Sequence, residues 1–122
     1  MEIPAKRQVF ETIISEWYET LLSAKVQPQL TLTANYLVVC DSSYTIQFVS
    51  LEQLRTFFAQ KNIQMANVLQ WTVDQQADCF IVVAVVSFLS EDEEVFKGTE
   101  TLKIRRGDAL VVENIAGVLR QQ

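Results

Sequence analysis

The segment Cys79-Phe-Ile-Val-Val-Ala-Val-Val-Ser-Phe-Leu89 is the longest apolar run in the chain. Its β-branched and aromatic residues are typical of a strand, and it is too short to cross a membrane as a helix. Apolar side chains occupy both alternations of the run, so both faces of this strand require cover. One face can pack against helices. The other calls for a second subunit, and we therefore expect a homodimer that packs through the sheet.

Further strands are predicted on either side of this one, which we extend to Asp78–Leu89. The flanking strands are Ala66–Asp74, Val95–Arg105 and Ala109–Val118. Polar breaks separate the four strands at 75–77, 90–94 and 106–108. Because these connections are short, we expect adjacent strands to pair antiparallel.

Helices are predicted in the first half of the chain. From about Pro4 to Ala24, apolar residues recur at the i, i+3, i+4 and i+7 spacing of one buried helix face. Ser50–Lys61 is the second helix, and Ser50 with Gln53 has the spacing of a capping box. Between these helices, Pro28 fits the start of a short helix that carries Leu30 inward.

Two short strands, Tyr36–Cys40 and Tyr44–Phe48, form a small hairpin around a turn at 41–43. Helices followed by a long meander of strands indicate an α+β fold in one domain, residues 1–122. We expect the long N-terminal helix and the shorter helices to pack in the concave face of a curved, mostly antiparallel sheet. Such a cone encloses space for a small ligand.

The composition excludes several classes of function. The 122 residues include 10 Lys and Arg, 15 Asp and Glu and no His, for a net charge of −5. Nucleic acid is not an expected partner, because phosphate contacts need clustered basic residues. Without His, one chain cannot build a Ser-His-Asp or Cys-His system or most catalytic zinc sites. We expect no metal, no cofactor and no membrane association. Cys40 and Cys79 should be reduced and buried, and the absence of a leader favours the cytoplasm.

Three polar residues occupy positions where the pattern calls for an apolar one. Tyr18 lies in the apolar stripe of the first helix, and Asp41 follows the first strand in phase with Leu37 and Val39. Glu100 alternates with Leu102, which places its carboxyl on the apolar face of its strand. A carboxyl in a core is costly unless it is paired, protonated or solvated in a cavity. These residues are the candidate functional groups.

Each of the three also has a structural explanation. Tyr18 can be a core tyrosine whose hydroxyl bonds a backbone carbonyl. Asp41 can form an Asx-turn with Ser43. Glu100 can pair with Arg55 or Arg105, or lie at a dimer interface.

The order of elements resembles the nuclear transport factor 2-like superfamily, and within it the ketosteroid isomerase and polyketide cyclase branch. The similarity lies in Tyr-Glu-Thr-Leu-Leu-Ser-Ala at 18–24, in Leu-Thr-Ala-Asn-Tyr-Leu-Val-Val-Cys-Asp at 32–41, and in Gly-Thr-Glu-Thr-Leu-Lys-Ile at 98–104. The resemblance implies a cone-shaped fold. It also implies roles for Tyr18 as an oxyanion-hole tyrosine, Asp41 as the general base and Glu100 as the protonated acid of the oxyanion hole. The isomerases have Asp where this chain has Glu100.

On this resemblance, Asp41 removes a proton next to a carbonyl, and Tyr18 with neutral Glu100 holds the enolate oxygen. This arrangement is the one that the isomerases themselves use. The expected pocket is apolar and lined by Trp17, Leu30, Phe48, Phe58, Trp71 and Phe80. Three hypotheses follow: an isomerase, cyclase or dehydratase acting on a small hydrophobic carbonyl compound, a non-catalytic module that binds a small hydrophobic molecule or a protein, and a self-associating protein.

Overall fold

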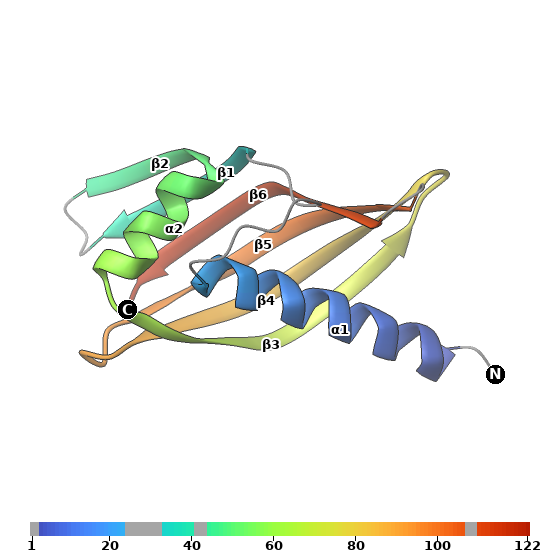
Figure 1. Cartoon of the computed structure of the whole chain (residues 1–122), viewed down its shortest axis with the longest axis horizontal. Coiled ribbons are helices and arrows are strands. Elements are labelled where there is room, and N and C mark those ends of the chain that lie inside the picture. Colours follow the sequence, from blue (N-terminus) through green and yellow to red (C-terminus); the bar gives the residue numbers. More distant parts are fainter. Residues whose placement is uncertain (1–2, 24–32, 41–43, 107–109) are drawn as a thin grey trace.

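A computed structural model of the chain describes residues 3–23, 33–40, 44–106 and 110–122. This part of the chain forms two α-helices and six β-strands (Figure 1). The elements are α1 (Ile3–Leu22), β1 (Thr33–Cys40), β2 (Tyr44–Ser50), α2 (Leu51–Gln60), β3 (Ile63–Gln75), β4 (Cys79–Ser90), β5 (Val95–Arg106) and β6 (Leu110–Gln121). The short helix predicted at Pro28, with Leu30, lies outside the described residues, and so does Asp41.

The strands form one sheet in the order β2-β1-β6-β5-β4-β3. All consecutive strands that pair do so antiparallel, as the short connections predict. The pairing of β1 with β6 is parallel and brings residues about 80 positions apart side by side, as with Tyr36 and Gly117. Figure 1 shows α1 and α2 on the same face of the sheet, with α2 over the end formed by β1 and β2. The predicted α+β arrangement is confirmed.

Helix α1 contacts the sheet through the apolar stripe that the sequence predicts. Its buried hydrophobic residues are Phe10, Ile13, Ile14, Trp17, Tyr18 and Leu21. Helix α2 begins after Ser50, whose hydroxyl oxygen accepts a hydrogen bond from the backbone N–H of Gln53 at 3.4 Å. This bond satisfies one of the free N–H groups of the first turn, so the capping role predicted for Ser50 is confirmed.

The ends of several elements differ from the prediction. Strand β3 begins at Ile63 instead of Ala66, and β6 continues to Gln121 instead of Val118. In both cases the extra residues are held by the neighbouring strand, since Ile63 pairs with Ser90 and Gln121 with Phe96. Pairing across the sheet therefore extends strands into sequence whose local pattern is weak.

Strand β4, which lies between β5 and the edge strand β3, has one covered face and one open face. Val82, Ala84, Val86 and Phe88 are fully buried beneath the helices. On the opposite face, Val83 is 38% exposed. Leu37 of β1 is 39% and Val118 of β6 is 41% exposed on that same side. We call this side the outer face of the sheet.

An irregularity in the pairing of β6 turns two of its side-chain positions toward the helices. Between β5 and β6, Thr101 pairs with Ala116 but Leu102 pairs with Asn114, so Ile115 is an extra residue in β6. Because of this β-bulge, Asn114 and Gly117 both face the helices although three positions separate them. A second irregularity lies in β1 between Thr33 and Tyr36.

Asn35 connects these two irregular segments. Its backbone N–H donates to Oδ1 of Asn114 at 2.8 Å, and its side-chain amide donates to the carbonyl oxygen of Ile115 at 3.1 Å. The bulged parts of β1 and β6 are thus held together next to the positions from which Tyr36 and Asn114 point inward. Bulges that aim particular side chains are common beside functional sites.

Candidate functional site

Neighbouring residues on all six strands form one row across the helix-facing side of the sheet. From one edge to the other, the register gives Phe48, Tyr36, Gly117, Glu100, Ala84 and Trp71. Glu100 therefore lies between two small residues, Gly117 and Ala84. The small neighbours leave room above the sheet for the side chains that reach Glu100 from α1 and β1.

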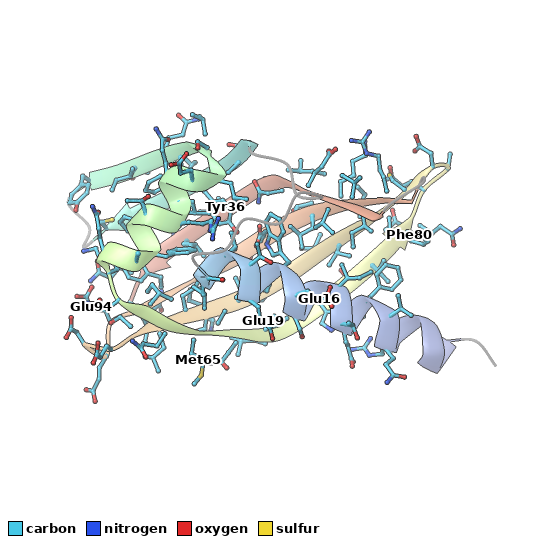
Figure 2. The ribbon with its side chains drawn as sticks, in the orientation of Figure 1. Glu16, Glu19, Tyr36, Met65, Phe80 and Glu94 are labelled. Atoms are coloured by element: carbon cyan, nitrogen blue, oxygen red, sulfur yellow. The ribbon has the colours of Figure 1, made fainter. Side chains whose placement is uncertain are left out.

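Gly117 makes the position of Tyr36 possible. A Cβ atom at Gly117 would lie 2.5 to 2.9 Å from three carbon atoms of the Tyr36 ring. The ring thus packs flat against the backbone of β6, where any other residue would collide with it. Figure 2 shows Tyr36 pointing into the space between the sheet and the two helices.

Glu100 is fully buried and is surrounded by neutral hydrogen-bond donors. The hydroxyl of Tyr18 donates to Oε1 at 2.6 Å, and the side-chain amide of Asn114 donates to Oε2 at 2.8 Å. The indole N–H of Trp17 lies 3.2 Å from both carboxyl oxygens. We call Trp17, Tyr18, Tyr36, Glu100 and Asn114 the Glu100 cluster.

Tyr36 differs from the other members because its hydroxyl has no hydrogen-bond partner. The side chain is fully buried, and within the described residues no group meets its hydroxyl at hydrogen-bonding distance and angle. The hydroxyl is nevertheless close enough to the Glu100 carboxyl for each to affect the pKa of the other. A buried hydroxyl without a partner costs about 1–3 kcal/mol relative to one that is satisfied.

Burial controls the electrostatics of the cluster. It raises the pKa of Glu100 above the ordinary value of 4.5, and the nearby O–H and N–H groups of Tyr18, Tyr36, Asn114 and Trp17 only partly oppose this effect. Burial, and then the nearby Glu100, raise the pKa of Tyr18 and of Tyr36 well above 10.0. Both phenols therefore remain protonated in neutral solution.

The observed partners of Tyr18 and Glu100 decide between the structural explanations offered for these residues. Tyr18 bonds the Glu100 carboxyl instead of a backbone carbonyl. Arg105 forms its ion pair with Glu113, and Arg55 donates to the backbone oxygen of Ser23. Among the described residues, no Lys or Arg forms an ion pair with Glu100.

Asp41 lies outside the described residues, but the strand before it is described. The phase that suggested an inward Asp41 is that of Leu37 and Val39. Leu37 is exposed on the outer face and Val39 is half-buried, whereas Val38 and Cys40 are buried beneath the helices. The phase of the strand therefore gives no support to an inward Asp41, and the inward position at the end of β1 is held by Cys40.

The residues predicted to line a pocket lie in different places. Trp17 belongs to the Glu100 cluster, and Leu30 is outside the described residues. Phe58 stacks near Phe88 with ring centres 4.7 Å apart, and Phe48 contacts Phe57 at 5.1 Å.

Trp71 and Phe80 instead surround Phe10, with ring centres 6.3 and 5.0 Å from it. The guanidinium of Arg7 lies 4.4 Å above the Trp71 ring. Figure 2 shows Phe80 well apart from Tyr36 along the sheet. These rings fasten the beginning of α1 to the sheet.

A surface hollow of about 390 Å³ lies between α2 and β2. Its lining consists of Ile46, Phe48, Glu52, Gln53, Thr56, Phe57 and Gln60. Phe48 is the one predicted pocket residue among them, and no member of the Glu100 cluster takes part. The hollow is therefore separate from the buried acid.

No three His, Cys, Asp or Glu side chains of the described chain come together as metal ligands. None of the described helices is both long and apolar enough to cross a membrane.

Sequence reasoning missed two members of the cluster, Tyr36 and Asn114. Both carry a readable signal. Tyr36 alternates with Val38 and Cys40, and Asn114 alternates with Val112, so each polar side chain lies in phase with buried apolar residues. The sequence does not show that Gly117 faces the helices, because the bulge at Ile115 reverses the alternation of side chains that precedes it.

Comparison with solved structures identifies the fold. The chain is similar to an NTF-2-like protein of unknown function from Silicibacter pomeroyi, with a TM-score of 0.65 and 11% sequence identity over 100% of both chains. It is also similar to an NTF2-like protein of unknown function from Shewanella baltica, with a TM-score of 0.58 and 10% identity over 100% of this chain and 97% of that one.

A third similar structure is named as a candidate ketosteroid isomerase from Parabacteroides distasonis. It has a TM-score of 0.50 and 20% identity over 92% of this chain and 86% of that one. The sequence matches no protein-family model and no curated protein. At these identities the likeness establishes the fold: the chain has the nuclear transport factor 2-like fold, as the sequence resemblance implies.

Proposed function

We propose that this protein binds a small, mainly apolar molecule at the Glu100 cluster and holds it through one oxygen atom. The observation that carries the proposal is the Tyr36 hydroxyl, which is fully buried beside Glu100 and has no hydrogen-bond partner among the described residues. A ligand oxygen would supply that partner. The surrounding side chains are aromatic and aliphatic, which suits a flat hydrophobic body.

The energetics of the cluster favour a binding role over a purely structural one. A buried carboxyl without a cation is costly, and the free hydroxyl of Tyr36 adds to that cost. A protein with apolar side chains of similar volume in the same space would be more stable. Polar groups that are kept at such a cost are typical of functional sites.

Binding requires a change in the cluster, because Glu100 and Tyr36 are completely buried. The contact that can be replaced most easily is that of Trp17, whose indole N–H is shared between two oxygens at 3.2 Å. The Tyr18 bond at 2.6 Å is much shorter. We therefore expect the Trp17 side chain to move when a ligand oxygen reaches Glu100.

A titration that uses tryptophan fluorescence tests this proposal. Trp71 is replaced by Phe, so that Trp17 remains as the one fluorescent indole. The probes are 2-acetylnaphthalene and 2-ethylnaphthalene, which have nearly the same shape and differ in a carbonyl oxygen. We expect the ketone to bind more tightly by about tenfold, the value of one hydrogen bond in a buried site. The Tyr36→Phe variant, which lacks the free hydroxyl, should lose this preference. Equal binding of the two probes, or none, would contradict the proposal.

Proton transfer next to a carbonyl is the catalytic form of this proposal. It follows from the resemblance to the ketosteroid isomerase branch, in which Asp41 would act as the base and Tyr18 with Glu100 would hold the enolate oxygen. Exchange of the methyl protons of 2-acetylnaphthalene with D₂O, followed by NMR, tests it. The catalytic form predicts accelerated exchange that Asp41→Asn abolishes while binding of the ketone is kept. Exchange unaffected by this substitution would remove Asp41 as the base.

Self-association through the outer face is a second proposal. Leu37 pairs with Val118, which pairs with Thr99, which pairs with Val85, so an uncharged row crosses four strands of that face. Leu37 and Val118 are 39% and 41% exposed. Exposed apolar patches of this kind are typical of protein interfaces, and a second copy of the chain would cover the row.

A further inference from the structure

The side-chain amide of Asn114 has a fixed orientation. Its Oδ1 accepts the backbone N–H of Asn35 at 2.8 Å. Its Nδ2 faces two acceptors, Oε2 of Glu100 at 2.8 Å and the backbone oxygen of Ala116 at 3.3 Å. Rotating the amide by 180° would place oxygen against both acceptors and nitrogen against the Asn35 N–H. The bulged segments of β1 and β6 therefore determine which atom of Asn114 meets Glu100.

This orientation makes the two oxygens of Glu100 unequal. Oε2 accepts from Nδ2, which can only donate, so this oxygen is best suited to be the carbonyl oxygen of a protonated carboxyl. Oε1 faces the hydroxyl of Tyr18 at 2.6 Å, and a hydroxyl can donate or accept. When Glu100 is protonated, Oε1 is therefore the favoured position of the proton, because Tyr18 can accept it there while the carbonyl oxygen Oε2 keeps the bond from Asn114. The Tyr18 oxygen then accepts that proton, and the Tyr18 proton is free to turn toward another acceptor.

We propose that Asn114 is a positioning residue that confines the proton of Glu100 to Oε1, so that the site presents free hydroxyl donors to a neutral acceptor oxygen such as that of a ketone. The ligand class in this inference rests on the proposed binding function, whereas the position of the proton does not. The groups that face Glu100 are Trp17 and Tyr18 from α1, Tyr36 from β1, and Asn114 from β6. None of these four side chains carries a charge, and burial raises the pKa of Glu100.

Infrared spectroscopy tests the position of the proton directly. In neutral solution the exposed carboxyl groups are ionised, so the C=O stretch of a protonated acid should come from Glu100 alone. We expect this band in the wild type and its loss in Glu100→Gln. Removing the Nδ2 donor with Asn114→Leu should move the band to higher frequency, because the carbonyl at Oε2 loses its hydrogen bond. Asn114→Ala gives a second variant in case the larger side chain prevents folding.

Asn35→Ala is the matched control. It removes the side-chain bond to Ile115 but keeps the backbone N–H that orients Asn114, so the infrared band should stay in place. In Asn114→Leu, the preference for 2-acetylnaphthalene over 2-ethylnaphthalene should fall by about tenfold.

The outcomes separate the two proposals. A wild-type spectrum without the protonated band would show that Glu100 is ionised and would overturn the inference whether or not a ligand binds. A band that does not move in Asn114→Leu would overturn the role of Asn114. A band that behaves as expected in a protein that binds neither naphthalene would keep the proton on Oε1, and it would refute the ligand class together with the proposed function.

Discussion

The hydroxyl oxygen of Tyr18 lies 2.6 Å from Oε1 of Glu100, although 82 positions separate the two residues in the chain. One side chain comes from the apolar stripe of α1 and the other from the helix-facing side of β5. Their contact joins the helix to the centre of the sheet by a polar bond within an apolar core.

Replacing Tyr18 by Phe should reduce the free energy of unfolding by about 1–3 kcal/mol, because Oε1 of Glu100 loses its shortest hydrogen bond while buried. The same change should raise the pKa of Glu100 further, since the Tyr18 bond lowers it. Urea denaturation measures the first effect. An infrared titration of the protonated carboxyl measures the second, and a lowered pKa of Glu100 in Tyr18→Phe would contradict this description of the pair.

The raised pKa of Glu100 makes a definite prediction about pH. Above pH 4.5, the unfolded chain releases the Glu100 proton while the folded chain keeps it. The folded state then binds more protons, so this residue's contribution to stability is fully present below pH 4.5 and is lost as the pH rises through the folded-state pKa. Denaturation of the wild type and of Glu100→Gln at a series of pH values isolates this contribution. The wild type should lose stability relative to the variant as the pH rises, and the opposite slope would mean that the pKa is lowered.

Gly117→Ala should destabilise the protein by about 1–3 kcal/mol, because the added methyl group overlaps the Tyr36 ring. The backbone of Gly117 has no positive φ, so the penalty comes from this collision and not from backbone strain. In a Tyr36→Leu background the ring is absent and the penalty should become small. A double-mutant cycle of unfolding free energies measures the coupling between the two sites, and additive effects would show that the ring and Gly117 do not depend on each other.

A charge on the outer face tests the proposed self-association. Val118→Lys should produce a monomer at concentrations where the wild type is a dimer, since a buried lysine at the interface would have to lose its hydration. Val9→Lys is the control, because Val9 is 48% exposed on α1, away from the sheet's outer face. Analytical ultracentrifugation distinguishes the two states. A monomeric wild type at micromolar concentration would contradict the dimer.

Local patterns were sufficient for much of the fold and for three of the five residues of the Glu100 cluster: Trp17, Tyr18 and Glu100. The spacing of apolar residues around Tyr18 placed it on the buried face of a helix, and the alternation of Glu100 with Leu102 placed its carboxyl on the apolar face of its strand. These are the two residues that the structure brings together. The predicted antiparallel pairing of the last four strands also followed from short polar connections.

The remaining features depend on contacts that a local pattern does not contain. The parallel pairing of β1 with β6 joins distant segments, and the bulge at Ile115 decides that Gly117, not Ala116, lies beneath Tyr36. In β1, residues 36–40 are apolar or aromatic on both alternations, so the sequence cannot say which face is inward. That ambiguity is why the sequence could not show that Leu37 and Val39 lie on the side opposite to Val38 and Cys40.

The central claim is that the Tyr36 hydroxyl is left free for a ligand. Tyr36→Phe removes that hydroxyl and keeps the ring, so one variant can be measured for both stability and binding. Loss of an unsatisfied buried group should increase the free energy of unfolding of the unliganded protein by about 1 kcal/mol. The affinity for 2-acetylnaphthalene should fall while that for 2-ethylnaphthalene is unchanged. A variant that is less stable than the wild type and binds the ketone equally well would contradict the account.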